Sequence, residues 1–227
     1  MQLEAYVLSL QGEFKEKFDA YRALLLEYNE RYNLTTILEE KDMFYKHFLD
    51  SVAGEKYFKT GAKVIEIGSG AGFPSIPLKL LRDDLSFTLV ESVGKKCEFL
   101  HAVVDKLGLQ RVNIYSKRAE DLAKDGAFRE QYDAATARAV ARMNTLTEYC
   151  LPFVRQGGVF VAYKSGDTEE IEEAKNAYKI LGGRLKSVER YELPEDYGMR
   201  TLAVVEKVKP TPNKYPRGQG KERKSPL

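Results

Sequence analysis

The sequence predicts one doubly wound α/β domain with a mostly parallel sheet, and three observations lead to this fold class. From residue 62 onward, short apolar segments alternate with helical patterns, which favours parallel strands joined by right-handed crossovers. A glycine-rich turn follows the first apolar segment and precedes a helix. Near the end, segments 185–191 and 201–206 are long enough to pair as an antiparallel edge. We therefore expect seven strands, of which the last is antiparallel.

The positions of the individual strands and helices follow from the same alternation of short apolar segments with helical patterns. Parallel strands are expected over residues 64–67, 87–90, 112–115, 134–136 and 159–163. Helices are expected over residues 76–81, 96–107, 119–124, 146–153 and 169–181. The glycine pair at 182 and 183 is expected to end the last of these helices.

The first sixty residues have a helical pattern of their own. Apolar and aromatic residues recur there at steps of three and four, namely Phe14, Phe18, Tyr21, Leu25, Tyr28 and Tyr32. We interpret this stripe as a face packed on the main domain rather than a surface that stacks on bases. A second, shorter helix is expected over residues 42–53 and carries Phe44, His47 and Phe48. The expected organisation is a helical extension over 1–60, a main domain over 61–207 and a tail over 208–227.

Charge is distributed unevenly along the chain. The net charge is +2, but residues 207–227 contain seven basic residues and one acid, Glu222, so this segment carries +6 and the rest −4. The same segment contains four prolines, so it is expected to form little regular structure. Two interpretations remain open from the tail alone, a solvated end or an arm that neutralises phosphates.

Composition excludes several classes of protein. No apolar run approaches the length of a membrane span, and the first residues lack the layout of a signal peptide, so we expect a cytoplasmic protein with no membrane association. Cys97 and Cys150 lie on separate predicted helices and are expected to be reduced, buried thiols. Two histidines and no ligand motif predict no metal site. Since no long apolar stripe remains unassigned, we expect a monomer.

The glycine-rich turn contains Gly68, Gly70 and Gly72, which allow the backbone to turn tightly and approach a ligand. The spacing is one residue shorter than the fingerprint of dinucleotide-binding proteins, whose loop must present amides to a pyrophosphate. S-adenosylmethionine has no phosphate, so its loop needs only room for the methionine end and the ribose. Glu91 ends the second predicted strand, 23 positions after Gly68, where a carboxylate can accept hydrogen bonds from ribose hydroxyls. The sequence therefore favours S-adenosylmethionine, although a turn without ligand and a solvated glutamate are the simpler alternatives.

Charged residues follow the other strands at the edge where open α/β sheets bind ligands. Glu120 could accept from adenine or ribose, or could be an acid in the first turn of a helix. Arg138, Arg142 and Lys164 add positive charge beside the expected cofactor. Several basic residues at one edge indicate an anionic substrate and favour nucleic acid over a neutral metabolite.

A set of motifs spread over nearly the whole chain is much more specific than any one of them. In order, they are Asn33-Leu34-Thr35, residues 47–51 (HFLDS), 66–77 (EIGSGAGFPSIP), 91–96 (ESVGKK), Arg118-Ala119-Glu120, Ala137-Arg138-Ala139, Lys164-Ser165-Gly166 and residues 214–217 (KYPR). This combination closely resembles the bacterial 16S ribosomal RNA guanine-N7 methyltransferases, the glucose-inhibited division protein B family. The chain has Glu66 and Glu91 where the family often has Asp, and both changes keep the acid.

The resemblance implies a Rossmann-like class I methyltransferase that binds S-adenosylmethionine. It implies cofactor contacts at Gly68, Phe73, Ala119, Glu120 and Arg138. It also implies that the substrate is a guanine of 16S RNA near the decoding site, in the small ribosomal subunit or an assembly intermediate. The tail is typical of the family, which favours RNA contact for it.

Guanine N7 carries a free lone pair, so no proton has to leave before it attacks a methyl group, and no general base is expected. Arg138 and Lys164 are our candidates for placing the nucleotide, with His47 and Asp50 closing the pocket from the N-terminal side; alternatively, His47 only packs beside its aromatic neighbours. The candidates for RNA contact are Arg142, Lys164, Arg200, Lys214 and Arg217. Arg138 has two candidate roles, toward cofactor or RNA.

Three other classes remain as alternatives. A nicotinamide-dependent dehydrogenase disagrees with the loop spacing and the antiparallel closing strands. A noncatalytic RNA-binding or ribosome assembly protein could retain the cofactor pocket. A methyltransferase for another acceptor is disfavoured by the basic strand ends and the tail.

Overall fold

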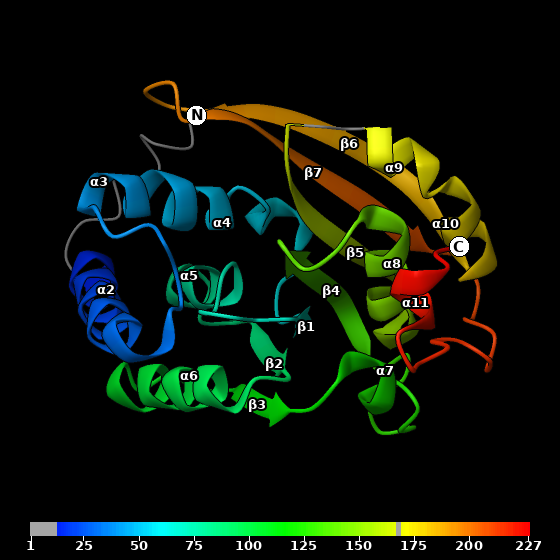
Figure 1. The fold of residues 1–227 in the computed structure, drawn as a ribbon, viewed down its shortest axis with the longest axis horizontal. Coiled ribbons are helices and arrows are strands. Elements are labelled where there is room, and N and C mark those ends of the chain that lie inside the picture. Colours follow the sequence, from blue (N-terminus) through cyan, green and yellow to red (C-terminus); the bar gives the residue numbers. More distant parts are fainter. Residues whose placement is uncertain (1–12, 167–168) are drawn as a thin grey trace.

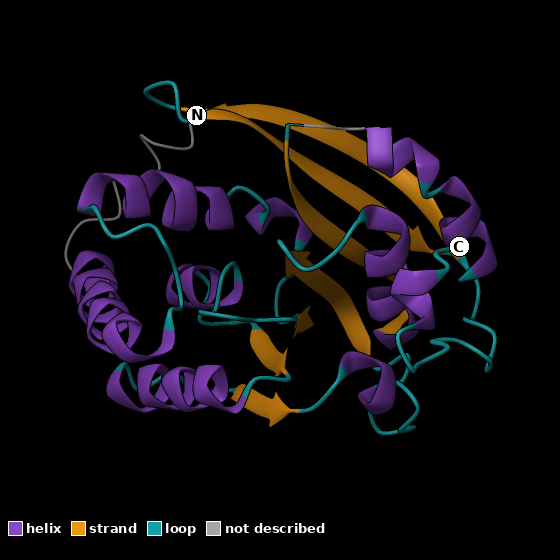
Figure 2. Cartoon of the chain, in the orientation of Figure 1, coloured by secondary structure: helices purple, strands orange, loops and turns teal. Residues whose placement is uncertain are grey.

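A seven-stranded sheet runs through the centre of the protein and is covered by helices on both faces (Figures 1 and 2). The computed structural model describes residues 13–166 and 169–227. The strands are β1 (Lys63–Ile67), β2 (Ser86–Glu91), β3 (Val112–Ser116), β4 (Tyr132–Arg138), β5 (Val154–Ser165), β6 (Gly183–Leu193) and β7 (Gly198–Lys207). They lie in the order β3-β2-β1-β4-β5-β7-β6, and β7 is antiparallel to both of its neighbours. The predicted fold class, with an antiparallel last strand, is confirmed.

The helices agree with the expected positions and differ in detail. They are α2 (Glu13–Tyr32), α3 (Glu40–Met43), α4 (Asp50–Val52), α5 (Ser75–Leu81), α6 (Gly94–Lys106), α7 (Ala119–Leu122), α8 (Met143–Cys150), α9 (Glu169–Glu173), α10 (Lys175–Ile180) and α11 (Lys221–Lys224), with short 3₁₀ turns at Glu55–Tyr57 and Leu151–Phe153. The helix expected over 169–181 is two helices that meet at Ala174. The helix expected over 42–53 contains a π-helical stretch, Phe44–Leu49, a feature often found at functional sites.

Each face of the sheet has its own apolar core. On one face, α2 packs against α5 and α6, and Phe18, Tyr21 and Leu25 from its aromatic stripe are buried there. The side chain of Phe14, which begins the stripe, lies outside the described residues. On the other face, α8 and α10 pack over β4, β5 and β7. Among residues 13–166 and 169–227, no helix combines the length and the apolar character needed to cross a membrane.

The C-terminal tail follows the surface of the main domain and is anchored to it at several points. The Arg129 guanidinium donates to the carbonyls of Thr211 (2.8 Å) and Tyr215 (2.9 Å), and both of these tail residues are buried. Farther along, α11 lies against α8 (Figure 1). The tail forms little regular structure, as expected, but the interpretation as a solvated end is wrong for this anchored part.

Candidate cofactor and RNA site

The glycine-rich turn after β1 has the backbone that its composition predicts. Gly68, Gly70 and Gly72 have φ of +69°, +55° and +88°, a region that L side chains rarely adopt. A Cβ on Gly68 would lie 2.7 Å from a methyl carbon of Val140, so this position has no room for a side chain. A Cβ on Gly70 would meet nothing nearer than the Gly68 carbonyl oxygen at 3.8 Å. The turn is therefore closed beneath Gly68 and open above Gly70, where a ligand can approach.

Glu91 holds the glycine turn with its carboxylate. Its Oε2 accepts from the Gly70 amide at 2.9 Å and its Oε1 accepts from the Val93 amide at 2.8 Å. The side chain is 6% exposed. A carboxylate has about four lone-pair sites, so these two hydrogen bonds leave capacity for two more donors.

A pocket opens at the carboxyl ends of β1, β2 and β3. Its lining residues are Ile67, Gly68, Val90, Ser92, Lys117, Arg118, Ala119, Glu120, Val140, Tyr149 and Arg223. Of the candidate cofactor residues, Gly68, Ala119 and Glu120 line this pocket.

Two other candidate cofactor residues, Phe73 and Arg138, lie in a second cluster with His47, which faces the N-terminal extension. Phe73 stacks on the His47 ring with centroids 4.4 Å apart and planes at 21°. The Arg138 guanidinium lies 5.0 Å from the Phe73 ring centroid, in cation–π geometry. Gly72 directly precedes Phe73, and a Cβ there would stand 3.2 Å from the hydroxyl of Tyr21, whose ring centroid is 5.5 Å from that of Phe73. The candidate residues thus occupy the pocket, the Phe73–His47–Arg138 cluster and the glycine turn between them, where Glu91 holds Gly70.

Asp50 organises this cluster from the extension. Its Oδ2 accepts from Arg138 Nη1 at 2.9 Å, and its Oδ1 accepts from the Tyr191 hydroxyl at 2.6 Å. Arg200 lies farther away, with its Nε 3.9 Å from Asp50 Oδ1. Burial and the Asp50 charge hold the pKa of Tyr191 well above its usual range, so this phenol remains a donor. The network joins α4 to β4, β6 and β7.

His47 is a neutral member of the cluster. An arginine nitrogen only donates, so His47 Nδ1 accepts from Arg138 Nη2 at 3.1 Å and its Nε2–H donates to Thr35 Oγ1 at 2.9 Å. Burial, and then the Arg138 charge, lower the pKa of His47 to about 3. At neutral pH the imidazole therefore positions its neighbours and does not exchange protons.

Glu66 is a fully buried carboxyl residue on β1, near enough to Arg138 for its charge to affect this group. Burial raises the pKa of this carboxyl to about 8, which the Ser75 hydroxyl and Arg138 only partly offset. A second unusual backbone position adjoins the cluster, because Ala139 has φ +57° without being glycine. It separates Arg138, which points to Asp50, from Val140, which packs on Gly68.

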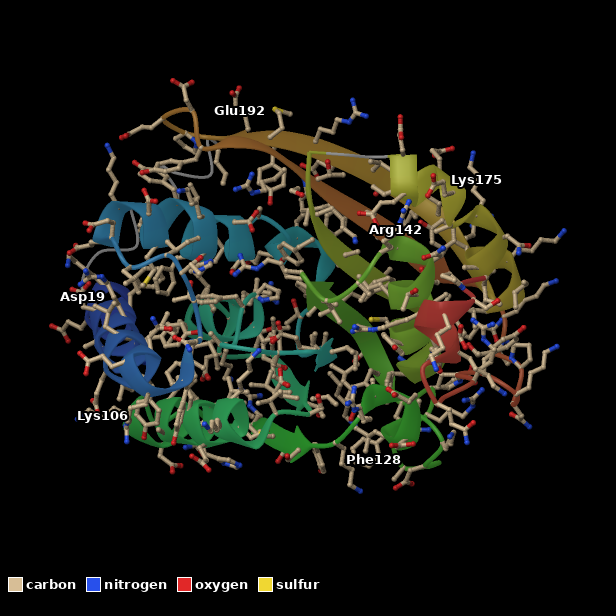
Figure 3. The ribbon with its side chains drawn as sticks, viewed as in Figure 1. Asp19, Lys106, Phe128, Arg142, Lys175 and Glu192 are labelled. Atoms are coloured by element: carbon tan, nitrogen blue, oxygen red, sulfur yellow. The ribbon has the colours of Figure 1, made fainter. Side chains whose placement is uncertain are left out.

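Lys164 lies near the end of β5 and Arg142 lies in the connection that follows β4, and the two side chains differ in exposure. Lys164 is 10% exposed, and its Nζ donates to the Ala141 carbonyl at 2.8 Å and pairs with Glu170 at 3.0 Å. Arg142 lies at the N-terminal end of α8 (Figure 3), with 68% of its side chain exposed in an ion pair with Glu173. Lys164 therefore ties loops together, and Arg142 is open to a partner.

The two RNA candidates in the tail also differ. Lys214 is exposed, with its Nζ 5.3 Å from the Tyr215 ring centroid. The Arg217 guanidinium instead donates to both oxygens of Glu148, a carboxylate on α8 that is fully buried. Arg217 is thus largely used inside the protein, which the basic character of the tail did not reveal.

Sequence reasoning missed several residues of the pocket. Val140, Tyr149 and Arg223 line it from a loop, a helix and the tail, and they belong to no motif with a recognised spacing. Tyr149 follows Glu148, the one charged residue of α8, and this acid beside a tyrosine was the available signal. For Arg223, the only available signal was the basic character of its segment.

Comparison with known proteins agrees with this geometry. Residues 14–197 match the family described as GidB, rRNA small subunit methyltransferase G. The ribosomal RNA small subunit methyltransferase G of Staphylococcus aureus strain bovine RF122 / ET3-1 is 46% identical over 100% of this chain and 95% of its own, and that of strain Newman is 45% identical over the same shares.

Solved structures share the fold at low sequence identity. An O-methyltransferase from Bacillus cereus in complex with SAH has a TM-score of 0.57 at 16% identity, covering 82% of this chain and 91% of that one. A SAM-dependent O-methyltransferase from Thermotoga maritima has a TM-score of 0.53 at 18% identity, covering 83% and 72%. The family resemblance predicted from the motifs is confirmed, and the chain belongs to the rRNA small subunit methyltransferase G family.

Proposed function

We propose that this protein uses S-adenosylmethionine to methylate N7 of a specific guanine in the 16S RNA of the small ribosomal subunit. The observation that carries the proposal is the arrangement of the pocket and the Phe73–His47–Arg138 cluster on either side of one glycine turn. Such an arrangement can hold a cofactor and a base next to each other. We further propose that it acts as a monomer in the cytoplasm, on the subunit or an assembly intermediate.

The residues present fit S-adenosylmethionine. The open space above Gly70 can take the methionine end, because a Cβ would fill it and glycine leaves it free. Glu91 retains capacity for two ribose hydroxyls after binding the Gly70 and Val93 amides. Glu120 lines the pocket and can accept from the adenine amino group. When bound, the cofactor supplies a methyl group on a positively charged sulfur.

The chain's own residues then have to place a guanine rather than activate it. The N7 lone pair forms the new bond as the carbon–sulfur bond breaks, and no proton leaves the base. His47 stays neutral because its pKa is about 3, which suits a reaction without a general base. Positioning of two reactants is worth roughly 7–11 kcal/mol in favourable cases. Arg138 offers a guanidinium donor for that purpose, and the buried Phe73 ring packs against it and against His47.

Arg138 has a fixed direction because Asp50 holds its Nη1 and His47 accepts from its Nη2. A guanidinium held this way can donate to the guanine edge or the cofactor carboxylate without first losing side-chain freedom. Lys164 supports the loop that follows Arg138 through the Ala141 carbonyl. The exposed basic residues Arg142 and Lys214 would contact phosphates.

The decisive experiment measures methyl transfer from radiolabelled S-adenosylmethionine to protein-free 16S RNA and to intact small subunits. Both acceptors come from a strain that lacks this gene, so that the target is unmodified. We expect label at one N7-methylguanine. Measurable cofactor binding without label on either acceptor would overturn the proposal and favour a noncatalytic assembly protein or another methyl acceptor.

A further inference from the structure

The pocket has a wall that the strand ends do not supply. Most of its lining comes from residues 67–120 and from Val140, at the carboxyl edge of the sheet. Among the described residues that line it, Arg223 alone lies C-terminal to β7, and its side chain is exposed. Arg223 belongs to α11, which packs against α8, and α8 contributes Tyr149 to the same pocket (Figure 1).

Two buried carboxylates fix the segment that carries Arg223. Glu148 is fully buried and accepts from the Arg217 amide at 2.8 Å as well as from its guanidinium. Glu222 is fully buried too, with its carboxylate accepting from the Gly218 amide and its carbonyl accepting from Thr145 Oγ1 at 2.8 Å. Because Glu222 directly precedes Arg223, the backbone of Arg223 is held at the pocket before any ligand arrives.

The chemistry of this wall fits an adenine ring. A guanidinium is planar, stays charged at all physiological pH values, and both stacks on aromatic faces and donates to ring nitrogens. Glu120 lines the same pocket and offers an acceptor, so donor and acceptor groups are both available to a purine edge. The neighbouring cations Lys221 and Lys224 are exposed and do not line the pocket. If α11 only contacted phosphates, there would be no reason for Arg223, and not Lys221 or Lys224, to line the pocket.

We propose that Arg223 is a cofactor-binding residue that contacts the adenine ring of S-adenosylmethionine, so that the C-terminal tail completes the cofactor site. The inference rests on the proposed function, because it takes the pocket as the adenosine site. Arg217 and Glu148 act as positioning residues for this contact. Cofactor affinity then depends on a segment whose basic composition had suggested a solvated end or RNA contact.

The test is calorimetric titration with S-adenosylhomocysteine in the absence of RNA. We expect Arg223→Ala to weaken binding about tenfold, as for a cation–π contact of intermediate strength. Arg223→Lys keeps the charge but loses the planar group, so it should remain weakened. Lys224→Ala, in the same short helix, is the matched control and should bind like the wild type. Thermal melts of all variants show whether the fold is retained.

Each other outcome has a separate meaning. Equal affinity of Arg223→Ala and Lys224→Ala for S-adenosylhomocysteine would overturn this inference while leaving methyl transfer by the wild type intact. Weaker RNA binding by Arg223→Ala with unchanged S-adenosylhomocysteine affinity would assign Arg223 to a phosphate and also overturn it. A wild-type protein that binds no S-adenosylhomocysteine would overturn the proposed function itself.

Discussion

The N-terminal extension and the C-terminal tail both reach the site from outside the sheet, but different forces attach them. The extension is attached by rings: Phe18, Tyr21 and Phe48 are buried against the core, and Phe48 also contacts Phe73 in the site. The tail is attached by charges, above all the pair between Arg217 and the buried Glu148. The extension supplies His47 and Asp50 to one cluster, and the tail supplies Arg223 to the pocket.

The difference matters because apolar burial and buried ion pairs respond differently to substitution. Removing an apolar ring costs the lost transfer energy and leaves a cavity. Removing one member of a buried ion pair leaves an uncompensated charge, whereas removing both can be nearly neutral. The two attachments can therefore be told apart by single and double variants.

The largest expected effect is on the extension. Phe48→Ala should lower the free energy of unfolding by about 3–5 kcal/mol, because Phe48 is 1% exposed and sits among other rings. Urea unfolding followed by circular dichroism measures the loss. Leu38→Ala, at a position that is 48% exposed, is the control and should change stability by less than about 0.5 kcal/mol. A loss below about 1 kcal/mol for Phe48→Ala would show that rings do not attach the extension.

The next effect is on the tail. Arg217→Ala should destabilise the protein by about 3 kcal/mol, because Glu148 then remains as a buried charge without its partner. The double variant Arg217→Ala, Glu148→Gln should recover part of that loss in the same unfolding measurement, since no charge is left stranded. If the double variant is no more stable than the single one, packing rather than charge holds the tail.

The fold was predictable because its signals are local and periodic. Short apolar segments predicted every strand from β1 to β7, and glycine spacing predicted a turn whose three φ values are positive. The stripe of Phe18, Tyr21 and Leu25 pointed to a packed face for the same reason, since side chains three and four apart share one side of a helix.

The tail was not predictable in this way, because its anchors depend on contacts far apart in the sequence. Arg217 and Glu148 are separated by 69 positions, and an arginine that pairs with a buried acid has the same letter as one that is solvated. The break at Ala174 and the π-helical stretch escaped prediction too, since neither changes the apolar pattern that marks a helix.

A pH titration sharpens the comparison at His47. Its folded pKa of about 3 lies below the unfolded value of 6.5, so the unfolded chain binds more protons between these values. The wild type should therefore lose stability as pH falls below 6.5, by about 2 kcal/mol at pH 5 from this residue. His47→Gln lacks that contribution, so the stability difference between the two proteins should change by this amount.

The comparison with His47→Gln isolates one group among several that titrate. Glu66 has a pKa raised to about 8 and makes the wild type lose stability as pH rises from about 4.5 to 8, but both proteins contain it. The unfolding free energies are measured at pH 5, 6 and 7. Parallel curves for the two proteins would show that His47 is not held neutral.

The smallest effect on stability is expected at Arg142, and it separates this residue from Arg217, another of the three arginines that the sequence had grouped as RNA contacts. Arg142→Ala should change stability by less than about 0.5 kcal/mol, because its ion pair with Glu173 is exposed. It should instead reduce the salt dependence of RNA binding by about one phosphate contact. The folded double variant Arg217→Ala, Glu148→Gln should leave that salt dependence unchanged. In the wild type the Arg217 guanidinium is already bound to the buried Glu148 carboxylate. If both changes lowered the salt slope equally, the tail would bind RNA through Arg217 as well, and the division between an inward-facing and an outward-facing arginine would fail.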